Sequence, residues 1–133
     1  MIDHFDTKEG TLDIDWSGVE DFIIISKKKW QKMPVDQSLG NFSKMIFNVK
    51  DVTDIVYDTP GKISGGKVLF IVKGYIYKDS FGDAEGATFC TVRKRDWERL
   101  YRILEQIGTM STCRGLKSGI DEKKWPKALR EDM

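Results

Sequence analysis

The sequence contains a single histidine, His4, and only two cysteines among its 133 residues. Cys90 and Cys113 lack the spacing of metal ligands, so we expect no metal site built from Cys and His. A lone histidine near the start of the chain is also a poor catalytic base, because a nucleophile and its base must be held rigidly together. These absences predict a protein without a metal, without a cofactor and without enzymatic activity.

A dominant charge and a long apolar run are also absent. The 22 basic and 21 acidic residues leave a net charge of +1, too small to attract nucleic acid or anionic lipid through an overall field. No apolar run approaches the roughly 18 residues of a membrane-spanning helix. The acidic opening residues do not resemble a signal peptide, so we expect a cytoplasmic location. Weak attraction to an anionic membrane or to nucleic acid would have to come from a local basic patch.

Three segments have the composition of a ligand site but not its spacing. Residues 79–86 are acidic but lack the ligand order of a calcium loop. Residues 61–67 contain glycines and lysines without the spacing of a phosphate loop, and we expect them to join two strands. Asp13 and Asp15 fall on one face of a predicted strand, and their alternation with apolar residues makes that face the solvated one.

The composition, 40% apolar and 32% charged, is that of one soluble domain with its own core. Residues 11–16 alternate between apolar and polar, and residues 22–25 form a β-branched block. Together they predict a hairpin that turns at Ser17 and Gly18. Further strands are predicted at residues 45–49, 52–57, 68–72 and 87–92. Cys90 falls within the last of these and is expected to be a small buried hydrophobe.

Residues 94–107 predict an amphipathic helix. Its apolar stripe consists of Trp97, Leu100, Tyr101, Leu104 and Ile107. Glu98 and Arg102 form a favourable pair on the opposite side, and Gly108 is suited to end the helix.

The remaining segments lack periodicity. Residues 1–10 are predicted to be a flexible tail, so the domain spans residues 11–108. Residues 109–133 are predicted to be a polar C-terminal tail with room for a short helix at residues 121–130. Residues 27–42 predict a long loop, a type of segment that is often functional.

Four segments carry a family resemblance. They are Leu12-Asp-Ile-Asp-Trp16 with Phe22-Ile-Ile-Ile25, Asn48-Val-Lys-Asp-Val-Thr-Asp-Ile-Val56, Gly65-Gly-Lys-Val-Leu-Phe-Ile71, and Ala87-Thr-Phe-Cys-Thr-Val-Arg-Lys-Arg-Asp-Trp97. Their order resembles the small bacterial pleckstrin-homology-like (PH-like) domains. The resemblance implies a mainly β (α+β) fold, a barrel or sandwich of about seven antiparallel strands capped by one C-terminal amphipathic helix. Residues 116–125 are similar to the oligomerisation tail of some members, which implies self-association through the C-terminal tail.

The candidate binding residues are two basic clusters and three apolar anchors: Lys27, Lys28, Lys29, Trp30, Met33, Phe42, Arg93, Lys94 and Arg95. A PH-like scaffold offers an exposed sheet edge and a groove beside the helix, where an extended peptide can add as a strand. The first hypothesis is therefore a non-enzymatic module that binds a protein or peptide, with Trp30, Met33 and Phe42 as anchors.

Two alternatives stay open. The basic clusters favour an anionic ligand, such as a lipid headgroup, a phosphate or nucleic acid. The acidic turn at residues 17–21 counts against phosphoinositides in particular. The second alternative is a small accessory or inhibitory protein of a phage or mobile element, which would act by occluding a partner.

Overall fold

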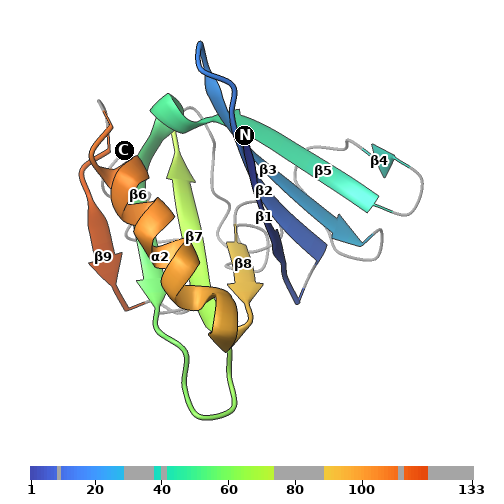
Figure 1. Ribbon diagram of the computed structural model, residues 1–133, viewed down its shortest axis with the longest axis vertical. Coiled ribbons are helices and arrows are strands. Elements are labelled where there is room, and N and C mark those ends of the chain that lie inside the picture. The colour runs from blue at the N-terminus through green and yellow to red at the C-terminus, as the bar shows by residue number, and fades with distance from the viewer. Residues whose placement is uncertain (9, 29–37, 40–41, 74–88, 111–112, 120–133) are drawn as a thin grey trace.

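The computed structural model is mainly β (Figure 1) and describes residues 1–8, 10–28, 38–39, 42–73, 89–110 and 113–119. The first of its two sheets, sheet A, has the strand order β1-β2-β3-β5-β4, and all neighbouring strands are antiparallel. Its strands are β1 (Ile2–Asp6), β2 (Gly10–Trp16), β3 (Asp21–Lys28), β4 (Ser38–Leu39) and β5 (Phe42–Asn48). The predicted hairpin is confirmed by β2 and β3, which pair from Gly10↔Lys27 to Trp16↔Asp21.

The second sheet, sheet B, has the order β8-β7-β6-β9. Its strands are β6 (Val52–Asp58), β7 (Gly66–Val72), β8 (Phe89–Val92) and β9 (Leu116–Ser118). The first three are antiparallel neighbours, whereas β9 runs parallel to β6. A short 3-10 helix, η1 (Val49–Asp51), turns the chain from β5 into β6. Asn48 caps it, because its Oδ1 accepts a hydrogen bond from the Lys50 amide at 3.0 Å.

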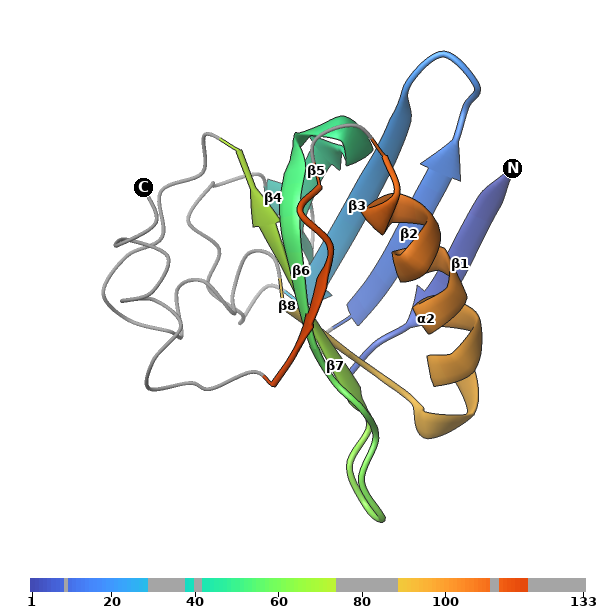
Figure 2. The same ribbon diagram turned by 90° about the vertical axis from the view of Figure 1, so that its left-hand side faces the viewer.

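The two sheets also touch where β1 meets β8. Thr7 forms a bridge with Val92, and the Lys8 amide donates to the Thr91 carbonyl at 2.9 Å. Apart from this bridge, the described strands do not close into a barrel. The helix α2 (Lys94–Gly108) lies across the opening between the sheets (Figure 2). The mainly β fold with one late helix is therefore confirmed, but the described residues contain nine strands rather than about seven.

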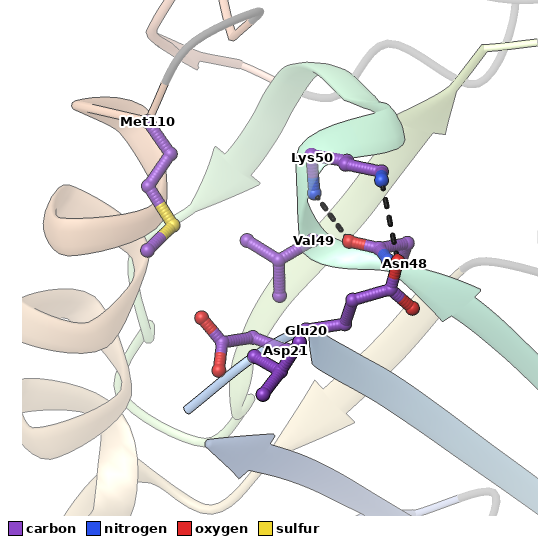
Figure 3. Close-up of a pocket in the computed structure, with 7 residues that line it drawn as sticks. Glu20, Asp21, Asn48, Val49, Lys50 and Met110 are labelled. Atoms are coloured by element: carbon purple, nitrogen blue, oxygen red, sulfur yellow. Dashed lines mark hydrogen bonds and ion pairs between the residues drawn. The ribbon is translucent and has the colours of Figure 1, made fainter. Parts of the chain in front are cut away.

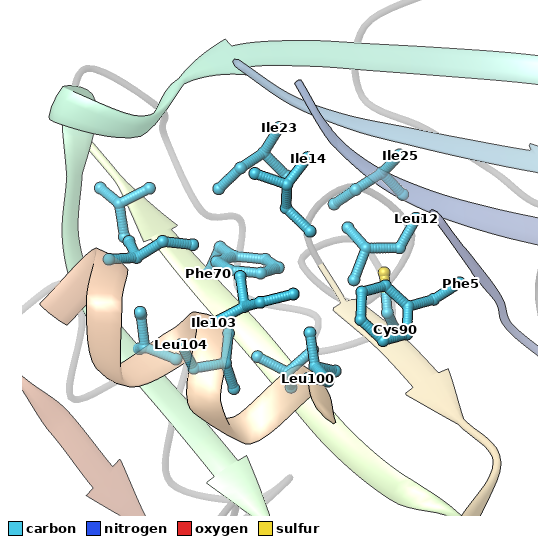
Figure 4. Close-up of a cluster of buried hydrophobic side chains, with 14 of the residues drawn as sticks. Phe5, Leu12, Ile14, Ile23, Ile25, Phe70, Cys90, Leu100, Ile103 and Leu104 are labelled. Atoms are coloured by element: carbon cyan, nitrogen blue, oxygen red, sulfur yellow. The ribbon is translucent and has the colours of Figure 1, made fainter. Parts of the chain in front are cut away.

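The core fills the space between the two sheets and α2 (Figure 4). Side chains from all three layers meet there, including Leu12, Ile14, Ile23 and Ile25 of sheet A, Phe70 and Cys90 of sheet B, and Leu100, Ile103 and Leu104 of α2. The predicted stripe of α2 is confirmed except at Tyr101, which is only partly buried, and Ile103 joins it. The burial of Cys90 is also confirmed.

The prediction of a flexible tail at residues 1–10 is wrong. All five residues of β1 pair with β2, and Phe5 is 1% exposed. The Arg99 guanidinium of α2 lies 3.9 Å from the centroid of the Phe5 ring. Ile2 and Phe5 are the only large apolar residues of β1, so sequence periodicity carried no strand signal there. The strand forms because β2 and α2 supply its partners.

Two other predicted boundaries also change. The predicted polar C-terminal tail includes a strand, because Leu116–Ser118 form β9, while the predicted helix at residues 121–130 lies outside the described residues. The predicted loop at residues 27–42 is too long at both ends. Lys27 and Lys28 belong to β3, and Phe42 begins β5.

His4 lies across the β1–β2 pair from Asp13. Its Nδ1 is 2.5 Å from Asp13 Oδ1, and its Nε2 is 3.3 Å from Asp6 Oδ1. The hydrogen bond to Asp13 raises the pKa of His4 above its ordinary value of 6.5; burial opposes this shift, and Asp6 adds to it. The interaction is therefore strongest when the imidazole is protonated.

This raised pKa predicts that the protein loses stability as the pH rises. Because the folded pKa of His4 exceeds the unfolded one, its stabilisation is complete below the unfolded pKa and disappears as the pH passes the folded pKa. Urea denaturation should show the free energy of unfolding falling as the pH rises from the unfolded pKa of 6.5 through the folded pKa, by no more than about 1 kcal/mol because the His4 side chain is half exposed. His4→Gln should flatten this slope, and an unchanged slope in that variant would contradict the assignment.

Candidate functional site

The predicted anchor loop lies largely beyond what the structure describes. Three predicted binding residues fall outside the described ranges: Lys29, Trp30 and Met33. For Lys27, Lys28 and Phe42 the structure gives the backbone, with Lys28 and Phe42 opposite each other in the β3–β5 pair. A binding role for these six residues stays a prediction.

The second basic cluster lies where β8 leads into α2. Arg93 is the N-cap of α2 without a side-chain capping bond, and Arg93, Lys94 and Arg95 are all exposed. Arg93 lines a pocket of about 310 Å³ together with Lys8. Lys27 is opposite Gly10, and the turn before Gly10 bridges β8, so the backbones of the two basic clusters lie at the same end of the fold.

A second pocket of about 360 Å³ lies between the β2–β3 turn, η1 and the end of α2 (Figure 3). Two of its charged groups pair with each other, because Lys50 Nζ lies 3.4 Å from Glu20 Oε1. Its Asn48 oxygen accepts from the Lys50 amide. Glu20, Asn48 and Lys50 are therefore engaged with one another in the pocket wall.

Two classes of site are not found within the described ranges. No group of three or more His, Cys, Asp or Glu side chains there could hold a metal ion. No helix in the described part of the chain combines the length and the apolar character needed to cross a bilayer.

The most complete binding geometry lies at the β6 edge of sheet B. Residues 113–119, which we call the β9 segment, run along β6 beside α2 (Figure 1). Besides the ladder of the β6–β9 pair, three backbone hydrogen bonds join the two: Arg114 N–H to Thr53 O at 2.7 Å, Ile55 N–H to Gly115 O at 3.3 Å, and Gly119 N–H to Tyr57 O at 2.8 Å. An extended segment thus adds to this edge as a strand.

On the α2 side of the edge, the β9 segment meets apolar surface. Leu116 is opposite Ile55 and packs against the core. A Cβ atom at Gly108 would lie 2.6 Å from Leu116 Cδ1, so a larger residue at this position would force the Leu116 side chain to shift. The glycine predicted to end α2 is instead its last residue and forms one wall of the Leu116 site.

An aromatic cluster continues this surface between β6 and α2. The ring centroid of Tyr57 lies 6.0 Å from that of Trp97 and 5.3 Å from that of Tyr101. A hydrogen bond with Tyr57 raises the pKa of Tyr101. Ser118 of the β9 segment is opposite Tyr57, so the segment ends beside these rings.

The other face of the edge holds a buried charge. Asp54 is 2% exposed, and its Oδ2 accepts two hydrogen bonds from Arg114, at 2.6 Å from Nη2 and 3.2 Å from Nε. Lys117 Nζ lies 3.4 Å from Oδ1. That contact is an ion pair but lacks hydrogen-bond geometry, so Oδ1 has no hydrogen-bond partner among the described residues. Among the residues that the structure describes, both cations that compensate Asp54 belong to the β9 segment.

The chain matches no protein-family model, no curated protein and no solved structure. Function is therefore inferred from the geometry of the β6 edge.

Sequence reasoning did not identify this edge. Asp54 belongs to a series of acids in and around β6, and the charge pattern alone does not distinguish it from its exposed neighbours. The one available signal was its place within a run of β-branched residues, where a solvated acid is unusual. Arg114 lies 60 residues further along the chain, so only the tertiary fold brings the pair together.

Proposed function

We propose that the protein is a non-enzymatic PH-like module that binds an extended segment of a partner protein at the β6 edge. The order of the longer strands supports the PH-like assignment. Four of them form a meander in sheet A, three form a second meander in sheet B, and α2 follows directly. With β4 and β9 counted as short additions, this order is compatible with the seven strands and one helix that the family resemblance implies.

The observation that carries the binding function is the β9 segment itself. It shows that the β6 edge accepts an added strand, with an apolar site on the α2 side and a charged site on the other. In this mode of recognition the main-chain hydrogen bonds supply affinity and the side-chain sites supply specificity. The pairing covers three residues and is parallel, the slightly weaker arrangement per residue, so a partner segment can compete for the edge.

Selection from a library of displayed random peptides, followed by amide NMR of the full chain, tests this proposal. We expect selected peptides to shift the amide signals of β6 and to displace the β9 segment. Leu116→Ala should tighten their binding about tenfold, because it weakens the intramolecular competitor.

Ile46→Ala is the matched control, since Ile46 is an exposed apolar residue on the outer face of sheet A. It should leave peptide binding unchanged. If the peptides shift only signals of sheet A, or if Leu116→Ala and Ile46→Ala behave alike, the β6 edge is not the binding site.

A further inference from the structure

The β6 edge contains a charge that it does not neutralise itself. Among the described residues, the cations within ion-pair distance of Asp54 are Arg114 and Lys117, and both come from the β9 segment. A buried carboxylate that loses its cations is strongly destabilising. Any segment that replaces β9 must therefore bring positive charge to the same place.

The positions of these cations are specific. Leu116 is opposite Ile55 on the α2 face, and Lys117 is opposite Val56 and reaches Asp54 on the other face. In a regular strand, residues 114 and 116 would share a face. Gly115 has a φ of +112°, a conformation that favours glycine, and it breaks this alternation. Arg114 thereby turns to the same carboxylate as Lys117.

We infer that the edge selects a basic segment with the order Arg, Gly, apolar residue, Lys. This inference rests on the proposed function and names its ligand class. The arginine and lysine would pair with Asp54, and the apolar side chain would lie against Gly108. A neutral or acidic segment would leave the Asp54 carboxylate buried without a cation. The edge would therefore reject such segments through this unfavourable contact, as well as favour basic segments through the ion pairs.

The occupant is a segment of a different protein. A second copy of this chain would offer the same residues that the β9 segment already supplies at high effective concentration, so the exchange would gain no contact. A separate partner can add contacts beyond this short motif and so displace the β9 segment. The net charge of the chain is only +1, so the selectivity comes from the local acid and not from an overall field.

The test uses the full chain carrying Arg114→Gln and Lys117→Gln, which weakens the intramolecular segment without shortening the protein. Two labelled peptides are titrated by fluorescence anisotropy. One has the sequence of residues 113–119 with serine in place of Cys113, and the other has glutamine at both basic positions. We expect the basic peptide to bind at least about tenfold more tightly than the neutral one. Asp54→Asn, added to this chain, should abolish the preference.

Asp15→Asn is the matched control, because it removes a strand carboxylate from sheet A, far from the β6 edge in the strand order. It should keep the preference. The comparison of the basic with the neutral peptide is made on a chain that retains Asp54. It therefore remains valid even if Asp54→Asn unfolds the protein.

The outcomes separate the inference from the proposed function. If both peptides shift β6 amides with equal affinity, or if the preference survives Asp54→Asn, the inference is wrong while the edge remains a binding site. If neither these peptides nor the selected library peptides bind at β6, the proposed function fails. Concentration-dependent dimers of the unaltered chain that exchange residues 113–119 would overturn the assignment to a separate partner.

Discussion

Replacing Leu104 with alanine should lower the free energy of unfolding by about 3 kcal/mol. Leu104 is 0% exposed and projects from α2 into the core between the two sheets (Figure 4). The substitution removes apolar contacts and leaves a cavity that the two sheets and α2 cannot fill without moving closer together. Urea denaturation followed by circular dichroism measures the loss.

Glu105→Ala is the control on the same helix, because Glu105 is exposed. It should change stability by no more than about 0.5 kcal/mol. If Leu104→Ala were equally mild, α2 would not be part of the core. That result would contradict both the proposed PH-like scaffold and the packing of the β6 edge beside α2.

Replacing Arg114 with alanine should cost about 2 kcal/mol and release the β9 segment from β6. Breaking a buried pair typically costs about 3–5 kcal/mol. The Arg114 side chain is 58% exposed, so we expect a value below that range. Hydrogen exchange of the Ile55 amide, which donates to the Gly115 carbonyl, should accelerate more than exchange in β2.

A double-mutant cycle separates the pair from its surroundings. Asp54→Asn combined with Arg114→Ala should cost about 1–2 kcal/mol less than the sum of the two single changes, because no buried charge is then left unpaired. Arg102→Ala is the control, since Arg102 forms an exposed pair with Glu98 at 3.0 Å and should contribute less than about 0.5 kcal/mol. Equal costs for Arg114→Ala and Arg102→Ala would contradict the buried pair.

Local periodicity predicted the elements whose burial follows a single simple pattern. The alternation of residues 11–16 places Leu12 and Ile14 in the core and leaves Asp13 on the other face. The helical spacing of α2 likewise predicted that Leu100 and Leu104 would be buried. In both cases the core lies on one side of the element, so the period of the side chains is visible in the sequence.

Strands at the margins of the fold were missed for a physical reason. β1 and β9 are edge strands, short and largely polar, and their stability comes from neighbours far away in the sequence. Phe5 is buried because β2 and α2 cover it, and Leu116 is partly buried because it packs beside Gly108 against the core. The composition of a short stretch of sequence does not show which distant residues will cover it in the fold.

The sequence by itself determined the mainly β class, the hairpin of β2 and β3, and the helix that covers the core, because each depends on a repeating pattern of neighbouring residues. Only the tertiary structure decided that the chain lays its own residues 113–119 on the β6 edge and that Asp54 is buried there between Arg114 and Lys117. Those contacts join residues about sixty positions apart, and burial of a charge depends on everything that packs around it.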